Sequence, residues 1–248
     1  MINVGIIGCG VVGEALKNWL ENNNPNCKIF ISDPPKGYND DLSDIDITFI
    51  QIHIPTEEDG SQNLELIKQI INGLPNVPVF VRTTILPGTS ELLSNETGHH
   101  VYYMPEFLTE RTHLDDFNNQ TMVFTGEFEL LAKIFVGKKF TTMSPLEAEL
   151  TKYMHNVFGA YKVTYFNACR EFCEQMGVDR DKVHDGILLS GYINDTHTYV
   201  PGPDGKFGYG GKCFPKDVNA FAKMTEGTPL GVLLEHIDEL NKHFRKKI

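Results

Sequence analysis

A chain of 248 residues, of which 41% are hydrophobic and 22% charged, is long enough to bury a sizeable core in one or two domains. Its formal net charge of -11 argues against nucleic acid as a partner, because phosphate backbones are bound by clustered Lys and Arg. The apolar runs are too short to cross a bilayer and no charged segment precedes the apolar N-terminus, so we expect a cytoplasmic protein without a membrane partner. The 5 cysteines lack metal-ligand spacing, so neither a metal site nor a disulfide framework is expected.

Short β-branched runs alternate with helix-like segments through the first half of the chain. Strands are predicted at residues 2–7, 28–32, 47–52, 77–81, 101–104 and 121–125, with a short one near 138–142. Helices are predicted between them at residues 11–21, 64–72 and 89–93. This alternation is typical of βαβ units, so the fold class is predicted to be α/β with a parallel sheet at the N-terminus.

Helical periodicity takes over in the second half. Apolar and aromatic residues trace one stripe of a long central helix over residues 145–176. Further helices are predicted at residues 179–189, just after Cys213, and at 229–245, and a loop rich in Gly and Pro spans 191–212. We therefore predict two domains, residues 1–143 and an all-helical domain at residues 144–248.

A glycine-rich turn follows the first predicted strand directly and opens an amphipathic helix, as a dinucleotide fingerprint requires. The glycines let the backbone approach a pyrophosphate, and the start of the helix supplies N–H donors. Asp33 ends the next strand, where a carboxylate can accept from both ribose hydroxyls and would repel a 2′-phosphate. We therefore predict a Rossmann-type NAD-binding domain over residues 1–143, rather than a plain strand-to-helix turn. The predicted contacts are Gly8, Gly10, Val11, Val12, Gly13 and Asp33.

Cys213 follows a pair of glycines in the segment Phe207-Gly-Tyr-Gly-Gly-Lys-Cys-Phe-Pro-Lys-Asp217. The start of a helix lowers the pKa of a thiol, and small neighbours leave room for a substrate carbon to approach. Cys213 is therefore a candidate nucleophile, and a buried structural thiol is the alternative that these residues alone leave open.

The glycine pair and the Cys-Phe-Pro-Lys-Asp sequence at residues 213–217 resemble the hallmark of the UDP-glucose/GDP-mannose dehydrogenase family. Further matching segments follow the family's order at residues 82–89, 104–110, 149–156 and 233–241, so the resemblance runs from Met1 to about Lys242. It implies an enzyme like UDP-glucose 6-dehydrogenase, which oxidises the primary alcohol of a nucleotide sugar to the uronic acid with NAD. Two hydride transfers would pass through a thiohemiacetal and a thioester on Cys213.

The resemblance also implies roles for individual residues. Lys152 and Asn156 lie four apart on one helix face and would stabilise oxyanion charge. Thr84 and Glu106 match residues that position a water and take up its proton, and Asp217 matches one that assists there; a buried carboxylate with a raised pKa would suit proton transfer. Thr84 and Glu110 are also expected near the cofactor. The expected substrate contacts are Phe107, Leu108, Lys152, Asn156, Phe207 and Gly210.

Simpler interpretations of these residues remain open: a solvated helix face, the end of a strand, a capped turn, and core positions for Phe107 and Leu108. Lys212 stands where the family usually has Ser, and its role is left unassigned. Full-length members continue into a second α/β domain that holds the nucleotide, whereas this chain ends at Ile248, so we expect that domain to be absent.

Three functional alternatives follow from this departure. The chain could be a minimal enzyme, an enzyme completed by a second chain that supplies a nucleotide-binding domain, or an NAD-binding remnant without catalysis. A different enzyme class, the two-domain β-hydroxyacid dehydrogenases, shares the Rossmann half and a catalytic Lys on the long helix, but transfers one hydride without a covalent cysteine.

Aromatic residues recur along the long helix and expose more apolar surface than one small helical domain can cover. They are Tyr153, Phe158, Tyr161, Tyr165 and Phe172. We therefore expect a homodimer built on this helix, as in the family. In the alternative, the last helix covers the stripe within one chain.

Overall fold

The computed structural model describes residues 1–57 and 59–247, which divide into two compact units. Unit 1 comprises Met1–Pro55 and Gln62–Lys152, and unit 2 comprises Thr56–Ser61 and the residues from Tyr153 onward. This division falls inside the long helix, after Lys152, which is nine residues beyond the predicted domain boundary at residue 143.

Unit 1 is built on a six-stranded sheet with the order β3-β2-β1-β4-β5-β6. The strands are β1 (Ile2–Ile7), β2 (Cys27–Asp33), β3 (Tyr38–Asn39), β4 (Ile47–Ile50), β5 (Val79–Val81) and β6 (Val101–Tyr103). Neighbouring strands run parallel except β2 and β3, which pair antiparallel just after the short 3-10 turn η1 (Pro34–Lys36). The predicted α/β fold with an N-terminal parallel sheet is confirmed.

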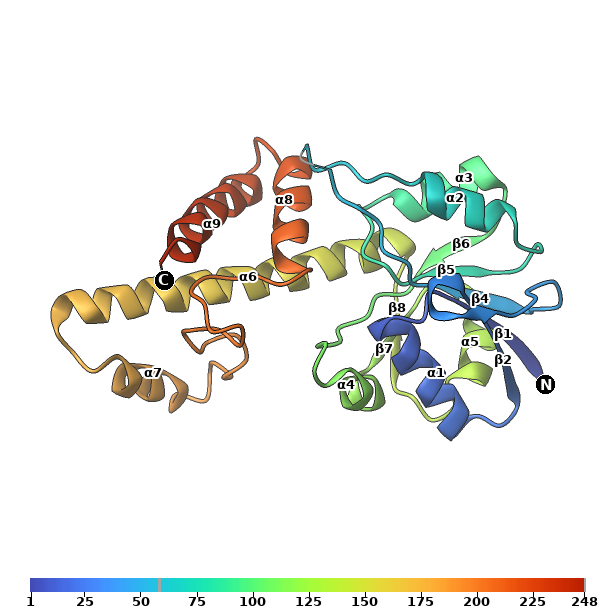
Figure 1. The fold of residues 1–248 in the computed structure, drawn as a ribbon, viewed down its shortest axis with the longest axis horizontal. Helices are drawn as coiled ribbons and strands as arrows, with labels where there is room; N and C mark the ends of the chain where they lie inside the picture. Colours follow the sequence, from blue (N-terminus) through green and yellow to red (C-terminus); the bar gives the residue numbers. More distant parts are fainter. Residues whose placement is uncertain (58, 248) are drawn as a thin grey trace. The chain divides into compact units, whose positions relative to one another are not determined.

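Helices cover both faces of this sheet (Figure 1). On one face lie α1 (Val11–Asn23), α4 (His113–Asn119) and α5 (Phe128–Ile134), where the Trp19 ring packs near Phe117 and Phe135. On the other face lie α2 (Glu65–Asn72) and α3 (Thr89–Thr97). Because the central strands are buried on both sides, they appear in the sequence as continuous apolar runs.

Two predicted strands do not join the main sheet. β7 (Met122–Phe124) pairs in parallel with β8 (Phe140–Thr142) in a separate two-stranded sheet. Thr125 Oγ1 donates to the Tyr103 carbonyl at 2.7 Å, so the segment after β7 contacts the end of β6 through a side chain instead of a ladder. The sequence also did not predict α4 and α5, because helices of 7 residues are too short for a clear helical period.

From Tyr153 to Lys247 regular secondary structure is helical. The helices are α6 (Pro145–Met176), whose first turns belong to unit 1, then α7 (Arg180–Leu188), α8 (Phe214–Met224) and α9 (Pro229–Arg245). Asp179 caps α7 by accepting from the main-chain N–H groups of Asp181 and Lys182, as the sequence predicts. Over residues 1–57 and 59–247, none of the helices combines the length and apolar character that crossing a membrane requires.

Candidate active site

The turn between β1 and α1 has the geometry of a pyrophosphate cradle. Gly8 adopts φ +84, and a Cβ there would lie 2.8 Å from the Gln51 carbonyl oxygen. A Cβ on Gly13 would lie 2.1 Å from the Gly8 carbonyl oxygen, so only glycine allows this turn to close on the helix. At Gly10, the residue before the first turn of α1, an added Cβ would meet no atom within 4 Å. The backbone N–H groups at the start of α1 are therefore open to a ligand.

Asp33, at the end of β2, lies beside this turn. Its Oδ2 accepts from the Cys9 main-chain N–H at 2.7 Å, and Lys36 Nζ donates to the Cys9 carbonyl at 2.7 Å. A cavity of about 800 Å³ is lined by the turn, Asp33 and the ends of β1 and β4. The glycine cradle, the helix start and the carboxylate together fit the adenosine diphosphate half of a dinucleotide.

The other predicted cofactor contacts are distributed around these elements. Val11 and Val12 form the half-buried first turn of α1. Thr84 follows β5 and is half-buried, and its carbonyl accepts from Gln62 Nε2 at 3.1 Å. Glu110 is exposed just before α4, and its carbonyl contacts His113 Nδ1. The carboxylate of Glu110 therefore has no buried position comparable to that of Glu106.

Lys152 and Glu106 form an ion pair inside unit 1. Lys152 Nζ lies 2.8 Å from Glu106 Oε1, and the two side chains are 5% and 12% exposed. Lys152 Nζ also donates to the Glu106 main-chain carbonyl, and its ammonium lies 5.6 Å from the centre of the Phe107 ring. The Leu108 N–H donates to Glu106 Oε2 at 2.8 Å. Both Phe107 and Leu108 are thus half-buried neighbours of this pair.

The charge of Glu106 differs from the sequence-based expectation. Burial alone would raise the pKa of its carboxyl, but the Lys152 ammonium, the Leu108 N–H and the Arg82 guanidinium outweigh burial and lower the pKa below its ordinary value. The expectation of a raised pKa is therefore wrong for Glu106. A residue held in its carboxylate form can accept a proton, but is a poor acid at neutral pH.

Arg82 is a buried cation at the end of β5 to which the sequence analysis gave no role. The side chain is 1% exposed, and its burial lowers the pKa of the guanidinium to about 10, partly offset by Glu106. Its Nε and Nη2 atoms have no hydrogen-bond partner among the described residues. The sequence signal that could have identified Arg82 as a buried cation was a charged residue at the end of an apolar strand. Arg82 and Lys152 together leave one positive charge in excess of Glu106.

Cys213 lies at the start of α8 in unit 2 and is exposed, which argues against the alternative of a buried structural thiol. Asp217, four residues later, is fully buried. Its Oδ2 accepts from Asn156 Nδ2 of α6 at 2.6 Å, and its Oδ1 accepts from Lys216 Nζ. The structure thus brings Asp217, in the first turn of α8, into contact with Asn156 of α6. Lys216, which the sequence analysis left without a role, completes this group.

The remaining predicted substrate contacts lie in the glycine-rich segment before Cys213. Phe207 is half-buried, with its ring centre 4.3 Å from the Arg170 guanidinium carbon. Gly210 approaches α9 so closely that an added Cβ would lie 2.0 Å from Arg245 Nη2. Phe207 is therefore engaged with Arg170 in this structure.

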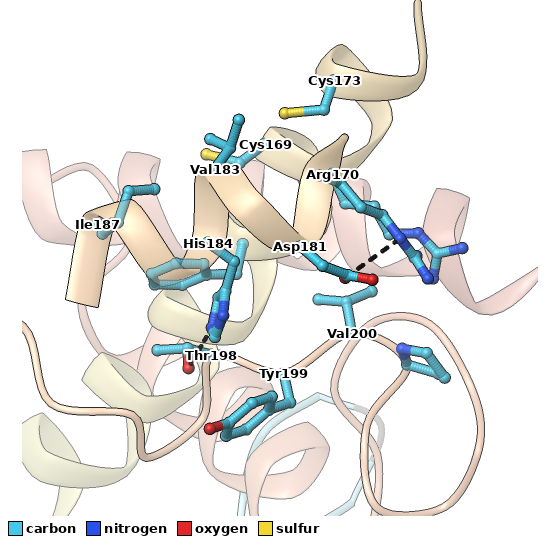
Figure 2. A pocket seen from close by; sticks show the side chains of 13 residues that line it. Cys169, Arg170, Cys173, Asp181, Val183, His184, Ile187, Thr198, Tyr199 and Val200 are labelled. Carbon is cyan, nitrogen blue, oxygen red and sulfur yellow. Dashed lines mark hydrogen bonds and ion pairs between the residues drawn. The ribbon is translucent and has the colours of Figure 1, made fainter. Parts of the chain in front are cut away.

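Another cavity, of about 190 Å³, lies in unit 2 between α6, α7 and residues 198–201. Figure 2 shows the thiols of Cys169 and Cys173 from α6 and the contact of 2.9 Å between His184 Nε2 and Thr198 Oγ1 at this cavity. Its lining, in the described part of the chain, includes none of the residues predicted for catalysis.

Comparison with known proteins finds similarity to nucleotide-sugar dehydrogenases. UDP-glucose 6-dehydrogenase of Rickettsia felis is 27% identical in an alignment of 209 residues, and the match covers 76% of this chain and 46% of that protein. A UDP-glucose dehydrogenase of Pyrobaculum islandicum has the same fold, with a TM-score of 0.80 and 24% identity over 98% of this chain and 68% of that chain. A Mycobacterium tuberculosis 3-hydroxyisobutyrate dehydrogenase also shares the fold, with a TM-score of 0.70 and 16% identity over 99% of this chain and 95% of that chain.

The chain spans about half the length of the curated relatives it matches. Residues 146–243 match the model of the UDP-glucose/GDP-mannose dehydrogenase family, central domain, which includes Lys152, Asn156, Cys213 and Asp217. Residues 146–243 are thus similar to the central domain of the UDP-glucose/GDP-mannose dehydrogenases.

Proposed function

We propose that this protein oxidises the primary alcohol of a nucleotide sugar to the uronic acid with NAD, as a UDP-glucose 6-dehydrogenase does. The observation that carries the proposal is the position of Cys213, an exposed thiol one helical turn before the buried Asp217, which Asn156 and Lys216 hold. An exposed thiol at a helix start is suited to covalent catalysis. The match of residues 146–243 to the central domain of the UDP-glucose/GDP-mannose dehydrogenase family supports the same reaction.

NAD is the proposed cofactor, and it would supply the hydride acceptor when bound. The turn at residues 8–13 is the proposed pyrophosphate site, because its N–H groups are open and an added Cβ at Gly10 would occupy that space. Asp33 Oδ1 and Oδ2 would accept from the ribose hydroxyls, which favours NAD over its 2′-phosphorylated form.

The proposed chemistry begins with loss of the proton from the alcohol hydroxyl and of a hydride from the alcohol carbon, which gives an aldehyde. Cys213 Sγ then bonds to the aldehyde carbon while a proton goes to its oxygen, which gives a thiohemiacetal. Loss of that proton and of a second hydride gives a thioester. Water adds to the thioester carbon, the C–S bond breaks, and the thiol and a carboxylate are released. One alcohol, one water and two NAD thus give one carboxylate, two NADH and three protons.

Three side chains have proposed roles that follow from their charges and contacts. Glu106, held as a carboxylate, would accept the proton of the attacking water. Lys152 would stabilise oxyanion charge as an ammonium. One N–H of the Asn156 amide is engaged with Asp217, which leaves its second N–H for an oxyanion. Thr84 remains the proposed residue that positions the water.

The test is NADH release by the purified chain over a panel of nucleotide sugars. Cys213→Ala should abolish formation of the acid, whereas Cys169→Ala, which removes a thiol at the smaller cavity, should retain it. Two NADH per acid formed would support the proposal. Turnover that persists in Cys213→Ala would contradict the covalent mechanism, and binding of NAD without turnover of any sugar would support the non-catalytic alternative.

Oxidation of a β-hydroxyacid is the second candidate function. The observation that favours it is the close fit in fold to a 3-hydroxyisobutyrate dehydrogenase, of which 95% is covered. That reaction transfers one hydride and needs no thiol. One NADH per product from a hydroxyacid, with no sensitivity to alkylation of Cys213, would decide for this candidate.

We also propose a homodimer formed through α6. Phe158 and Phe172 on this helix are 64% and 61% exposed, and Tyr161 and Tyr165 are exposed as well. Tyr153, which was expected in the same stripe, is instead buried and stacks on Phe221 of α8. Sedimentation should give a dimer that Phe158→Asp dissociates; a species of 28.0 kDa for the unmodified chain at micromolar concentration would contradict the proposal.

A further inference from the structure

Helix α9 holds the glycine-rich segment that leads to Cys213. Asn241 Oδ1 accepts from the Tyr209 main-chain N–H at 2.7 Å, and Asn241 Nδ2 donates to the Tyr209 carbonyl at 3.1 Å. Asn241 is only 6% exposed, so water does not compete readily for these bonds. One side-chain amide thus binds both polar groups of a single residue and fixes the main chain at Tyr209.

The side chain of Tyr209 is fixed by the same helix. Its ring is buried, and its hydroxyl donates to Asp238 Oδ1 at 3.2 Å. Asp238 lies three residues before Asn241, on the same face of α9. One turn beyond Asn241, Arg245 Nη1 donates to Asp204 Oδ2 at 2.8 Å. Successive turns of one helix face therefore contact the segment from Asp204 to Tyr209.

Glycine is required where the segment meets these side chains. Gly208 adopts φ +69, and a Cβ there would lie 2.4 Å from Asn241 Oδ1. The Gly208 N–H donates to Oδ1 of Asn167, a buried residue of α6, at 2.9 Å. Asn167 of α6 and Asn241 of α9 thus bind adjacent peptide groups of the glycine-rich segment. This arrangement gives a structural reason for Gly208 in the Phe-Gly-Tyr-Gly-Gly sequence.

The anchored residue lies close to the thiol along the chain. Only Gly210, Gly211 and Lys212 separate Tyr209 from Cys213, and α8 begins at the next residue. On the other side of Cys213, Asp217 is fixed to Asn156 of α6. The thiol therefore lies on a short segment whose two ends are held by buried hydrogen bonds.

We propose that Asn241 is a positioning residue, which acts through Tyr209 and the glycines to set the orientation of Cys213. The inference rests on the proposed function, because it assigns a role in the covalent steps.

The test uses Asn241→Asp in the full chain. This variant keeps the size of the side chain and its acceptor for the Tyr209 N–H, but it places an oxygen opposite the Tyr209 carbonyl. Glu239→Gln is the matched control, because Glu239 is exposed on the same helix two residues away. We expect kcat to fall on the order of tenfold to a hundredfold in Asn241→Asp, with the KM for NAD unchanged, because covalent catalysis depends on orientation. The control should match the unmodified chain.

Two further measurements separate positioning from loss of folding. Amide hydrogen exchange in residues 207–213 should accelerate in Asn241→Asp while exchange in α6 stays unchanged. Alkylation of Cys213 by a small reagent should change less than twofold, because the thiol is exposed and the reagent needs no single orientation. Unchanged exchange, or an unchanged kcat, would overturn the inference. If the unmodified chain shows no turnover, the proposed function fails by itself, and the exchange measurement still decides whether Asn241 anchors the segment.

Discussion

Asn156 and Asp217 share a hydrogen bond of 2.6 Å in the interior of unit 2, between the long helix α6 and the first turn of α8. Asp217 has no exposed surface, and its second oxygen accepts from Lys216 Nζ. A buried carboxylate persists only when such partners replace water. This relationship fixes α8, and thereby Cys213 at its start, to the part of α6 that lies in unit 2.

Removal of the Asn156 amide should therefore destabilise the protein. In Asn156→Ala, Asp217 Oδ2 loses its donor without access to water, which costs roughly 1.5–3 kcal/mol of unfolding free energy for a bond to a charged group. Urea unfolding measures the change. Asn22→Ala, on the exposed surface of α1, is the control and should cost far less. A loss below about 0.5 kcal/mol in Asn156→Ala would show that Asp217 finds another partner.

Two carboxyls of unit 1, those of Glu106 and Glu149, should affect stability in opposite directions as pH changes. The pKa of Glu106 is lowered in the fold, so its contribution is present above the unfolded value of 4.5 and is lost as pH falls through the folded pKa. The pKa of Glu149 is raised, chiefly by burial, although Ser90 and the Gly88 N–H partly offset this. Its contribution is therefore present below 4.5 and is lost as pH rises through the folded pKa.

Substitution by Gln separates these two effects. Glu106→Gln should flatten the fall in unfolding free energy on the acid side of 4.5, and Glu149→Gln should flatten a fall on the alkaline side of that value. Urea unfolding over a series of pH values measures both slopes. The prediction is wrong if both variants alter the slope with the same sign.

Much of this architecture could be predicted from the sequence, because strong periodicity and helix caps identify the elements directly. The bounds of α6 and α9 agree with the prediction, since a long stripe and a Pro at the first position leave little ambiguity. The separate pairing of β7 with β8 could not be predicted, since local sequence does not specify strand partners. Neither could the pKa of Glu106, which depends on Lys152, 46 residues away in the sequence.

Replacement by Ala should have different effects at two glycines of the dinucleotide turn: it should lower stability at Gly13 and NAD affinity at Gly10. Gly13→Ala should destabilise the fold, because its Cβ would lie 2.1 Å from the Gly8 carbonyl oxygen. Gly10→Ala should fold normally, because nothing lies within 4 Å of its Cβ, but the methyl group would enter the space proposed for the pyrophosphate. We expect its NAD dissociation constant to rise about tenfold or more, which corresponds to about 1.4 kcal/mol. Calorimetric titration with NAD and thermal unfolding distinguish the two outcomes, and equal NAD affinity in Gly10→Ala would argue against this site.

Replacement of Lys152 by Met should raise the pKa of Glu106. The ammonium lies 2.8 Å from the carboxylate and is the strongest influence that keeps the pKa low, so its loss leaves burial, which raises the pKa, opposed mainly by Arg82 and the Leu108 N–H. We expect the pKa of Glu106 to rise, because a close opposite charge favours the ionised form of a carboxyl. Carbon-13 NMR titration of the Glu106 carboxyl measures it, with Glu106→Gln to assign the signal. Met preserves most of the length and apolar packing of the Lys side chain. If the pKa of Glu106 in Lys152→Met is no higher than in the unmodified chain, then Arg82, and not Lys152, holds Glu106 in its ionised form.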